Sequence, residues 1–251
     1  MSKNFELFQK LGREQELLQP ATPADGHPAP MAPPPTPSGE GAGAAGMEQV
    51  AALVQNVFLA SGADAPRTVV FSSPESETGC TWVCGHAAEV LASRVAGSVC
   101  LVDANLHAPA MHQQFSVDNV KGLAEALTEA DPIRTFARLL VAPNLWLISS
   151  GAGTEAARGL LGSDRMRLRM TELRKEFDYV LIDTAAMSTS HDAIGIGSLA
   201  DGVVLVLKAN SSRRETARQA VDNLQAGQAK VLGAVLNQRT YPIPESIYKR
   251  F

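Results

Sequence analysis

The chain has 251 residues, of which 45% are hydrophobic and 19% charged, and its formal net charge is -4. This composition supports one α/β domain of ordinary size with extensions, and it does not favour general nucleic-acid binding. No apolar run approaches the ~20 residues of a membrane span, the first residues lack a signal-peptide core, and three cysteines fit a reducing compartment. We therefore expect a soluble cytoplasmic protein without a nucleic-acid partner.

The N-terminal part divides into two segments by composition. Residues 1–19 predict a short amphipathic helix with one apolar face formed by Phe5, Phe8, Leu11 and Leu18. Residues 20–46 hold eight of the 15 prolines, mixed with Ala and Gly, which predicts a disordered linker. The tethered helix is either a frayed terminus or a docking peptide for a partner.

Helical patterns alternate with short apolar strands from residue 47 onward. Most of these strands are continuous runs of Val, Ile and Leu, which indicates burial on both faces of a parallel sheet. The pattern predicts a doubly wound, mostly parallel α/β domain at 47–239, followed by a tail at 240–251. The expected strands are 68–72, 98–103, 145–149, 179–183, 202–208 and 231–236. The expected helices are 47–60, 80–95, 123–130, 165–176 and 213–226.

The first strand runs into residues 71–81, FSSPESETGCT, which have the strand–loop–helix frame of a phosphate-binding loop. Gly79 and Thr81 keep this frame, but Cys80 stands at the lysine position and Glu77 at an expected glycine. Losing a charge-assisted phosphate contact costs on the order of 1.5–3 kcal/mol, and Glu75 and Glu77 add negative charge. We therefore expect the loop to bind ATP weakly.

Other groups near the loop have alternative interpretations. Arg67, Arg94 or a partner chain are candidate sources of the missing cation. The position of Cys80 at a helix N-terminus favours a lowered thiol pKa, whereas Cys84 and Cys100 are interpreted as buried structural thiols.

Two of the expected strands end in an aspartate, Asp103 and Asp183. A carboxylate at the tip of a buried strand beside a phosphate loop typically holds Mg²⁺ or orients a nucleophile. Either aspartate alone is equally explained as a cap of the following turn. The two together, in this order around the loop, favour the metal interpretation.

These motifs together resemble the bacterial tyrosine kinases (BY-kinases) of capsule and exopolysaccharide synthesis, within the MinD- and ParA-like P-loop ATPases. The resemblance runs from about residue 47 to 238. Residues 76–81, SETGCT, stand where the family has Pro-Gly-Glu-Gly-Lys-Thr. Residues 103–109, DANLHAP, match the family's Asp-x-Asp-Leu-Arg-x-Pro, and residues 177–184, FDYVLIDT, match Phe-Asp-Tyr-Val-Ile-Ile-Asp-Thr.

The resemblance implies an ATP·Mg²⁺ site and assigns roles to its residues. Thr81, Asp103 and Asp183 would hold Mg²⁺, with the two aspartates also serving catalysis. The positions that match the family's nucleotide-binding residues are Gly79, Cys80, Thr81 and Asn237. Asn237 either corresponds to the family's base-contacting asparagine or forms a turn.

Two departures and two tail residues concern the phosphoryl-transfer step. Asn105 replaces an acid thought to help activate the attacking tyrosine, a general-base role that an amide does not fill. His107 replaces the arginine of the same motif. Tyr241 and Tyr248 in the tail are either phosphate acceptors or packing residues.

The resemblance, together with these losses, implies a non-catalytic or very weak kinase homologue that regulates exopolysaccharide synthesis. It would dock on a membrane polysaccharide co-polymerase or on an active kinase paralogue, and so be recruited to the inner face of the membrane. The first alternative is an active ATP-dependent tyrosine autokinase, and the second is a MinD/ParA-type positioning ATPase. Assembly into a homo-oligomer stays open.

Overall fold

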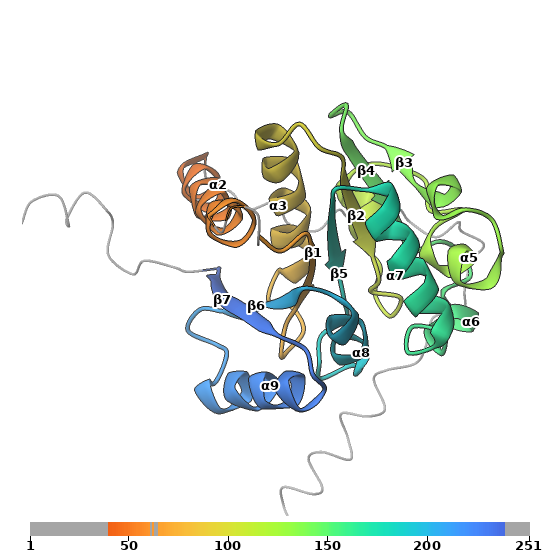
Figure 1. The fold of residues 1–251 in the computed structure, drawn as a ribbon. Coiled ribbons are helices and arrows are strands. Elements are labelled where there is room, and N and C mark those ends of the chain that lie inside the picture. Colours follow the sequence, from red (N-terminus) through yellow and green to blue (C-terminus); the bar gives the residue numbers. More distant parts are fainter. Residues whose placement is uncertain (1–39, 61, 63–64, 239–251) are drawn as a thin grey trace, which may run out of the picture. The chain divides into compact units, whose positions relative to one another are not determined.

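The computed structural model describes residues 40–60, 62 and 65–238 (Figure 1). The expectations for the helix at 1–19, for the linker up to residue 39, and for the tail with Tyr241 and Tyr248 lie outside these residues. None of the described helices is long and apolar enough to cross a membrane.

The described residues are built on a seven-stranded sheet with the strand order β3-β4-β2-β5-β1-β6-β7. All neighbouring strands pair in parallel except β3 and β4, which are antiparallel. This confirms the expected doubly wound, mostly parallel sheet, and it adds the short edge strand β3. The strands are β1 Thr68–Ser72, β2 Val99–Asp103, β3 Arg138–Leu139, β4 Leu145–Ile148, β5 Tyr179–Asp183, β6 Gly202–Lys208 and β7 Val231–Asn237.

Helices connect the strands, and several of them are short. They are α2 Glu40–Val54, the π-helical turn η2 Gln55–Leu59, α3 Cys80–Arg94, α4 Met111–Gln114, α5 Leu123–Thr128, the 3₁₀ turn η4 Ile133–Phe136, α6 Thr154–Arg158, α7 Asp164–Glu176, α8 Asp192–Leu199 and α9 Arg214–Ala226. The expectation of a disordered linker up to residue 46 is wrong for its last residues, because α2 begins at Glu40. The linker's prolines end at Pro37, so none of the residues of α2 is a proline that would break the helix.

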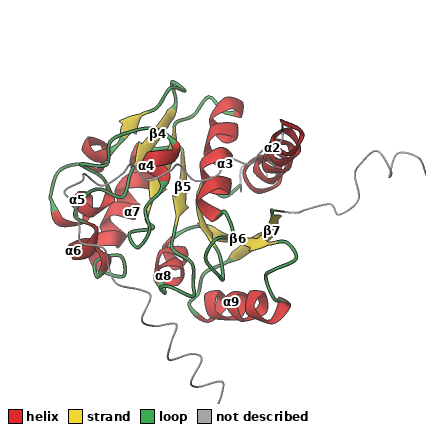
Figure 2. Ribbon diagram, turned by 180° about the vertical axis from the view of Figure 1, so that it is seen from behind, coloured by secondary structure: helices red, strands yellow, loops and turns green. Residues whose placement is uncertain are grey.

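The helices cover both faces of the sheet, so alternate strand residues enter two separate cores (Figure 2). Val69 and Phe71 of β1 pack with α2, η2, α3 and α4, whereas Val70 packs on the other face with α5, α7, α8 and α9. Burial on both faces explains why the strands are continuous apolar runs rather than alternating ones.

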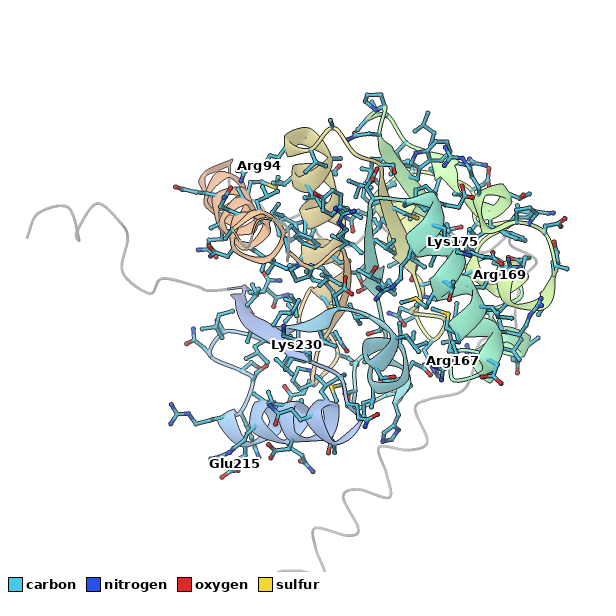
Figure 3. All side chains as sticks on the ribbon, viewed as in Figure 1. Arg94, Arg167, Arg169, Lys175, Glu215 and Lys230 are labelled. Atoms are coloured by element: carbon cyan, nitrogen blue, oxygen red, sulfur yellow. The ribbon has the colours of Figure 1, made fainter. Side chains whose placement is uncertain are left out.

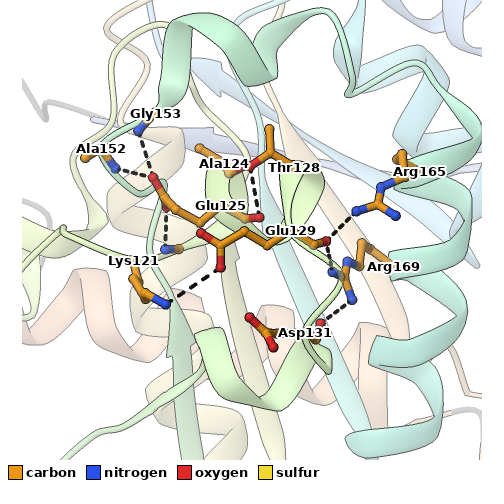
Figure 4. Close-up of polar contacts among 11 residues, drawn as sticks. Lys121, Ala124, Glu125, Thr128, Glu129, Asp131, Ala152, Gly153, Arg165 and Arg169 are labelled. Carbon is orange, nitrogen blue, oxygen red and sulfur yellow. Dashed lines mark hydrogen bonds and ion pairs between the residues drawn. The ribbon is translucent and has the colours of Figure 1, made fainter.

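A buried arginine joins α5 to α7 (Figure 4). Arg169 of α7 is only 3% exposed, and its guanidinium donates to the carbonyl oxygens of Ala126 (2.6 Å), Glu129 (2.8 Å) and Asp131 (2.9 Å). Arg165 adds a bond to the carbonyl of Leu127. The last carbonyls of a helix have no partner within it, so these two arginines complete the C-terminal end of α5.

The N-terminal end of α5 is tied to the loop after β4 by a single carboxylate. Glu125 accepts hydrogen bonds from the backbone N–H groups of Gly122 (2.8 Å), Ala152 (3.1 Å) and Gly153 (2.8 Å). Gly151 lies so close that a Cβ atom there would come within 1.9 Å of this carboxylate, and its φ is 84°. Both features require glycine at position 151.

Candidate functional site

The phosphate-loop frame lies at the carboxyl edge of the sheet, where β1 ends at Ser72 and α3 begins at Cys80. β1 is a central strand between β5 and β6. Gly79 precedes α3 with a φ of 78°, in the left-handed region. The strand–loop–helix arrangement expected from the sequence is therefore present.

Glu77 is the unusual residue of this loop. Its φ is 61°, in the left-handed region that glycine adopts freely and other residues rarely do. It occupies the position where the sequence comparison expected a glycine. The loop therefore has a left-handed residue at this position while carrying an exposed carboxylate side chain.

The environment of Cys80 contradicts the expected lowering of its thiol pKa. The side chain is buried, and burial raises its pKa well above the ordinary value; the neighbouring Asp183 carboxylate and Cys84 raise it further. These effects outweigh the favourable position at the start of α3. The thiol is neutral at pH 7, and it gives the loop no charge at all.

Neither arginine considered from the sequence reaches the loop. Arg67 directly precedes β1, at the opposite end of that strand, where its backbone N–H donates to Asp201. Arg94 lies at the far end of α3 from Cys80 and donates to the carbonyl oxygen of Ala51 in α2 (Figure 3). The sequence reasoning missed Lys208, which ends β6 at the carboxyl edge, beside β1. Its signal was a lysine at the end of an apolar strand.

The two aspartates come together as the sequence predicted. Asp103 and Asp183 are paired neighbours on β2 and β5, and both are fully buried. The Thr81 hydroxyl donates to Asp183 Oδ2 over 2.6 Å. Asp103 accepts from the backbone N–H groups of Asn105 (3.1 Å) and Met111 (3.2 Å). Asp183 Oδ1 is buried without a hydrogen-bond partner among the described residues.

Burial controls the protonation of this pair. Burial, together with the neighbouring Asp103 carboxylate, raises the pKa of Asp183 to about 8, although the Thr81 hydroxyl and the Cys80 thiol oppose the rise. Burial likewise raises the pKa of Asp103 to about 7, against the backbone N–H groups of Met111, Asn105 and Ala110. Two buried carboxylates side by side need either a shared proton or a cation.

The metal side of the site fits Mg²⁺, and the phosphate side fits ATP poorly. Mg²⁺ prefers oxygen ligands, and Thr81, Asp103 and Asp183 supply them, with one carboxylate oxygen unpartnered. Among the described residues no group of three or more His, Cys, Asp and Glu side chains is placed to hold a metal. A cation here would therefore depend on further ligands such as water or phosphate. On the phosphate side, Glu77 and Cys80 give no positive charge.

The other motif residues have structural partners. Asn105 Oδ1 accepts from the backbone N–H of Ala108 (3.1 Å) and so closes the turn after β2. His107 Nε2 lies 3.6 Å from Asp192 Oδ2 at the start of α8. This contact joins the turn after β2 to the start of α8.

The side chain of Asn237 contacts the phosphate loop, and its expected contact with a nucleotide base stays a prediction. Its Nδ2 donates to the carbonyl oxygen of Thr78 over 2.8 Å, and Gln238 Nε2 donates to that of Glu77 over 3.3 Å. Nothing in the pattern of β7 distinguished this contact from a turn, because it joins residues about 160 positions apart in the chain.

Comparison with known proteins gives the lineage of the chain. No family model matches it. Tyrosine-protein kinase YwqD of Bacillus subtilis is 28% identical over 190 residues, which cover 76% of this chain and 80% of YwqD. The chain is a relative of the bacterial tyrosine kinases. Putative tyrosine-protein kinase EpsB of Ralstonia nicotianae is 30% identical over 169 residues, 67% of this chain, but the match spans only 22% of EpsB.

Solved structures show the same fold. The kinase domain of Escherichia coli tyrosine kinase Etk has a TM-score of 0.71 at 24% identity, covering 79% of this chain and 78% of that domain. MinD in the MinC:MinD complex of Aquifex aeolicus has a TM-score of 0.59 at 18% identity, covering 73% of this chain and 72% of that one. This chain therefore has the fold that the Etk kinase domain shares with MinD.

Proposed function

We propose that this chain is a kinase-fold regulator of exopolysaccharide or capsule synthesis that acts by docking rather than by phosphoryl transfer. Its partner is a membrane polysaccharide co-polymerase or an active kinase paralogue. One observation carries the proposal: Glu77, with a left-handed φ, and the buried neutral thiol of Cys80 occupy the positions where the family has a glycine and the phosphate-binding lysine.

Electrostatics support the loss of tight nucleotide binding. The two loop acids, Glu75 and Glu77, precede a helix whose first side chain is uncharged, and two further carboxylates are buried behind it. A triphosphate entering this edge of the sheet would meet carboxylates without the lysine that normally offsets its charge. The sheet nevertheless has a buried core on each face, so the folded domain can still present a surface to a partner.

A second candidate, an ATP-dependent tyrosine autokinase, is favoured by the retained metal side. The Thr81 hydroxyl lies 2.6 Å from Asp183 Oδ2, and Asp183 Oδ1 has no hydrogen-bond partner among the described residues. In that case the tail tyrosines Tyr241 and Tyr248 are the natural phosphate acceptors in this sequence.

Mass spectrometry of the full chain after incubation with Mg·ATP separates the two candidates. We expect no phosphotyrosine at Tyr241 or Tyr248. Phosphorylation of either residue that disappears in Asp183→Asn would contradict the docking proposal and establish the autokinase.

Complementation tests the regulatory role itself. A deletion strain should regain polysaccharide production with the wild-type gene and equally with Asp183→Asn, because the proposed role needs no phosphoryl transfer. Failure of Asp183→Asn, with normal protein levels, would show that the acid pair is needed for activity and would refute the proposal.

A further inference from the structure

The contact between the end of β7 and the phosphate loop is made by two side-chain amides, those of Asn237 and Gln238. They donate to two successive loop carbonyls, those of Thr78 and Glu77. We infer that this pair, called here the amide clamp, positions the phosphate loop in the conformation that a glycine and a bound phosphate would otherwise maintain.

The loop needs such support because its conformation is unfavourable for its sequence. Glu77 has a φ of 61°, which costs a non-glycine residue energy. The hydroxyl of Thr78 is buried without a partner among the described residues. A strained backbone persists only where surrounding contacts determine its conformation. The amide clamp contacts the carbonyls of these two residues directly.

The geometry around Asn237 shows a contact built into the fold. Asn237 pairs with Lys208 at the end of the β6–β7 ladder, and its own carbonyl accepts from the N–H of Ala209 (2.8 Å). These backbone contacts fix the position of the Asn237 Cα atom, from which the side chain extends to the loop. Opposite it, a Cβ atom on Gly79 would lie 2.4 Å from Asn237 Nδ2. Glycine at position 79 is therefore needed for the amide to reach the loop.

The amide clamp also has a consequence for ligands. While Asn237 Nδ2 is bonded to the loop carbonyl, it is not available to another acceptor in the same direction. This inference concerns the loop alone and holds whether the chain acts by docking or by phosphoryl transfer, so its test is independent of the proposed function.

Hydrogen–deuterium exchange on the full chain tests the amide clamp. The double variant Asn237→Asp, Gln238→Glu keeps the side-chain shapes but removes both donors. We expect exchange of the Val83 amide, which donates to the loop carbonyl of Gly79 over 3.0 Å, to become about tenfold faster, the effect of two lost hydrogen bonds of ordinary net strength. The matched control Gln219→Glu, Gln225→Glu makes the same chemical change on exposed residues of α9 and should leave exchange of the Val83 amide unchanged.

Repeating the double variant in the Glu77→Gly protein distinguishes loss of loop positioning from general destabilisation of the fold. In Glu77→Gly the loop no longer needs to be held, so the same double variant should accelerate exchange of the Val83 amide only about threefold or less, a non-additive result. Peptides from α7 report global stability in the same samples. Val83 exchange within twofold of the wild type, equal acceleration of Val83 and α7, or fully additive effects with Glu77→Gly would each overturn the inference.

Discussion

Glu77 holds a backbone conformation that a glycine would adopt without steric strain. Replacing it with glycine removes the clash of the Cβ atom in the left-handed region, which outweighs the entropy that glycine adds to the unfolded chain. We predict that Glu77→Gly raises the free energy of unfolding by about 0.5–1 kcal/mol, measured by urea denaturation.

Glu75 provides the control for this prediction, because it lies in the same loop and carries the same charge but has no positive φ. Glu75→Gly should lower the free energy of unfolding, by roughly 0.5 kcal/mol or more. Equal stabilisation by both substitutions would show that charge removal, and not backbone strain, is responsible.

The acid pair at the ends of β2 and β5 makes stability depend on pH. Burial raises the pKa of Asp103 to about 7 and that of Asp183 to about 8, above the values of an unfolded chain. The folded state therefore binds protons more tightly, and this stabilisation is complete at low pH and lost as pH rises through 7 to 8. Each carboxyl contributes a slope of at most about 1.4 kcal/mol per pH unit.

We predict that the free energy of unfolding, measured in EDTA, falls between pH 5.5 and 8 for the wild type and falls less steeply for Asp183→Asn. The variant removes the carboxylate and its effect on Asp103, while histidines and other groups remain the same in both proteins. Identical pH profiles would contradict the assignment of the pH dependence to this pair.

At the scale of elements, the junction of α5 and α7 depends on Arg169. Its guanidinium is buried and donates to three backbone carbonyls. Arg169→Ala leaves the carbonyls of Ala126 and Asp131 without this donor, whereas that of Glu129 keeps Arg165, and it opens a cavity. We predict a loss of about 3 kcal/mol or more in the free energy of unfolding, since each unsatisfied buried group costs about 1–3 kcal/mol.

Arg167 is the matched control on the same helix (Figure 3). Its side chain is 67% exposed and pairs only with Asp164. Arg167→Ala should change the free energy of unfolding by less than about 0.5 kcal/mol. Similar losses in the two variants would refute a special role for Arg169.

The sequence predicted well those elements whose own residues carry a clear pattern, such as a continuous apolar run. The continuous apolar runs of β1, β5 and β6 gave the central strands with matching bounds. The pattern of α8, by contrast, contains two glycines, Gly195 and Gly197, which are poor helix formers. Gly197 is there because a Cβ atom would come within 2.7 Å of Val203, a packing constraint from another element. The two-residue β3 has no apolar run at all, and its formation depends on pairing with β4.

Some contacts of the candidate site could likewise be predicted from the sequence, and others could not. The approach of Asp103 to Asp183 was predictable, because the carboxyl ends of parallel strands meet at one edge. The contact of Asn237 with the loop and the burial of Cys80 were not, because each depends on side chains brought together by the fold. The lowered pKa expected for Cys80 was wrong for this reason: the helix N-terminus is visible in sequence, whereas desolvation is not.

At the scale of the whole molecule, a fold shared with Etk and MinD carries a phosphate loop of altered charge. Two complete cores hold the sheet, and the amide contacts from β7 hold the loop. The metal-side residues Thr81, Asp103 and Asp183 are in place. The described phosphate loop, residues 73–81, has no basic side chain of its own, and the weak nucleotide binding that we propose from this is our central claim.

Calorimetric titration with Mg·ATP tests that claim most directly, using the wild type, Glu77→Gly, and the double variant Cys80→Lys, Glu77→Gly. We predict no measurable binding to the wild type and a gain of at least about tenfold in affinity in the double variant, because a lysine–phosphate contact contributes about 1.5–3 kcal/mol. Micromolar binding of Mg·ATP by the wild type would contradict the account.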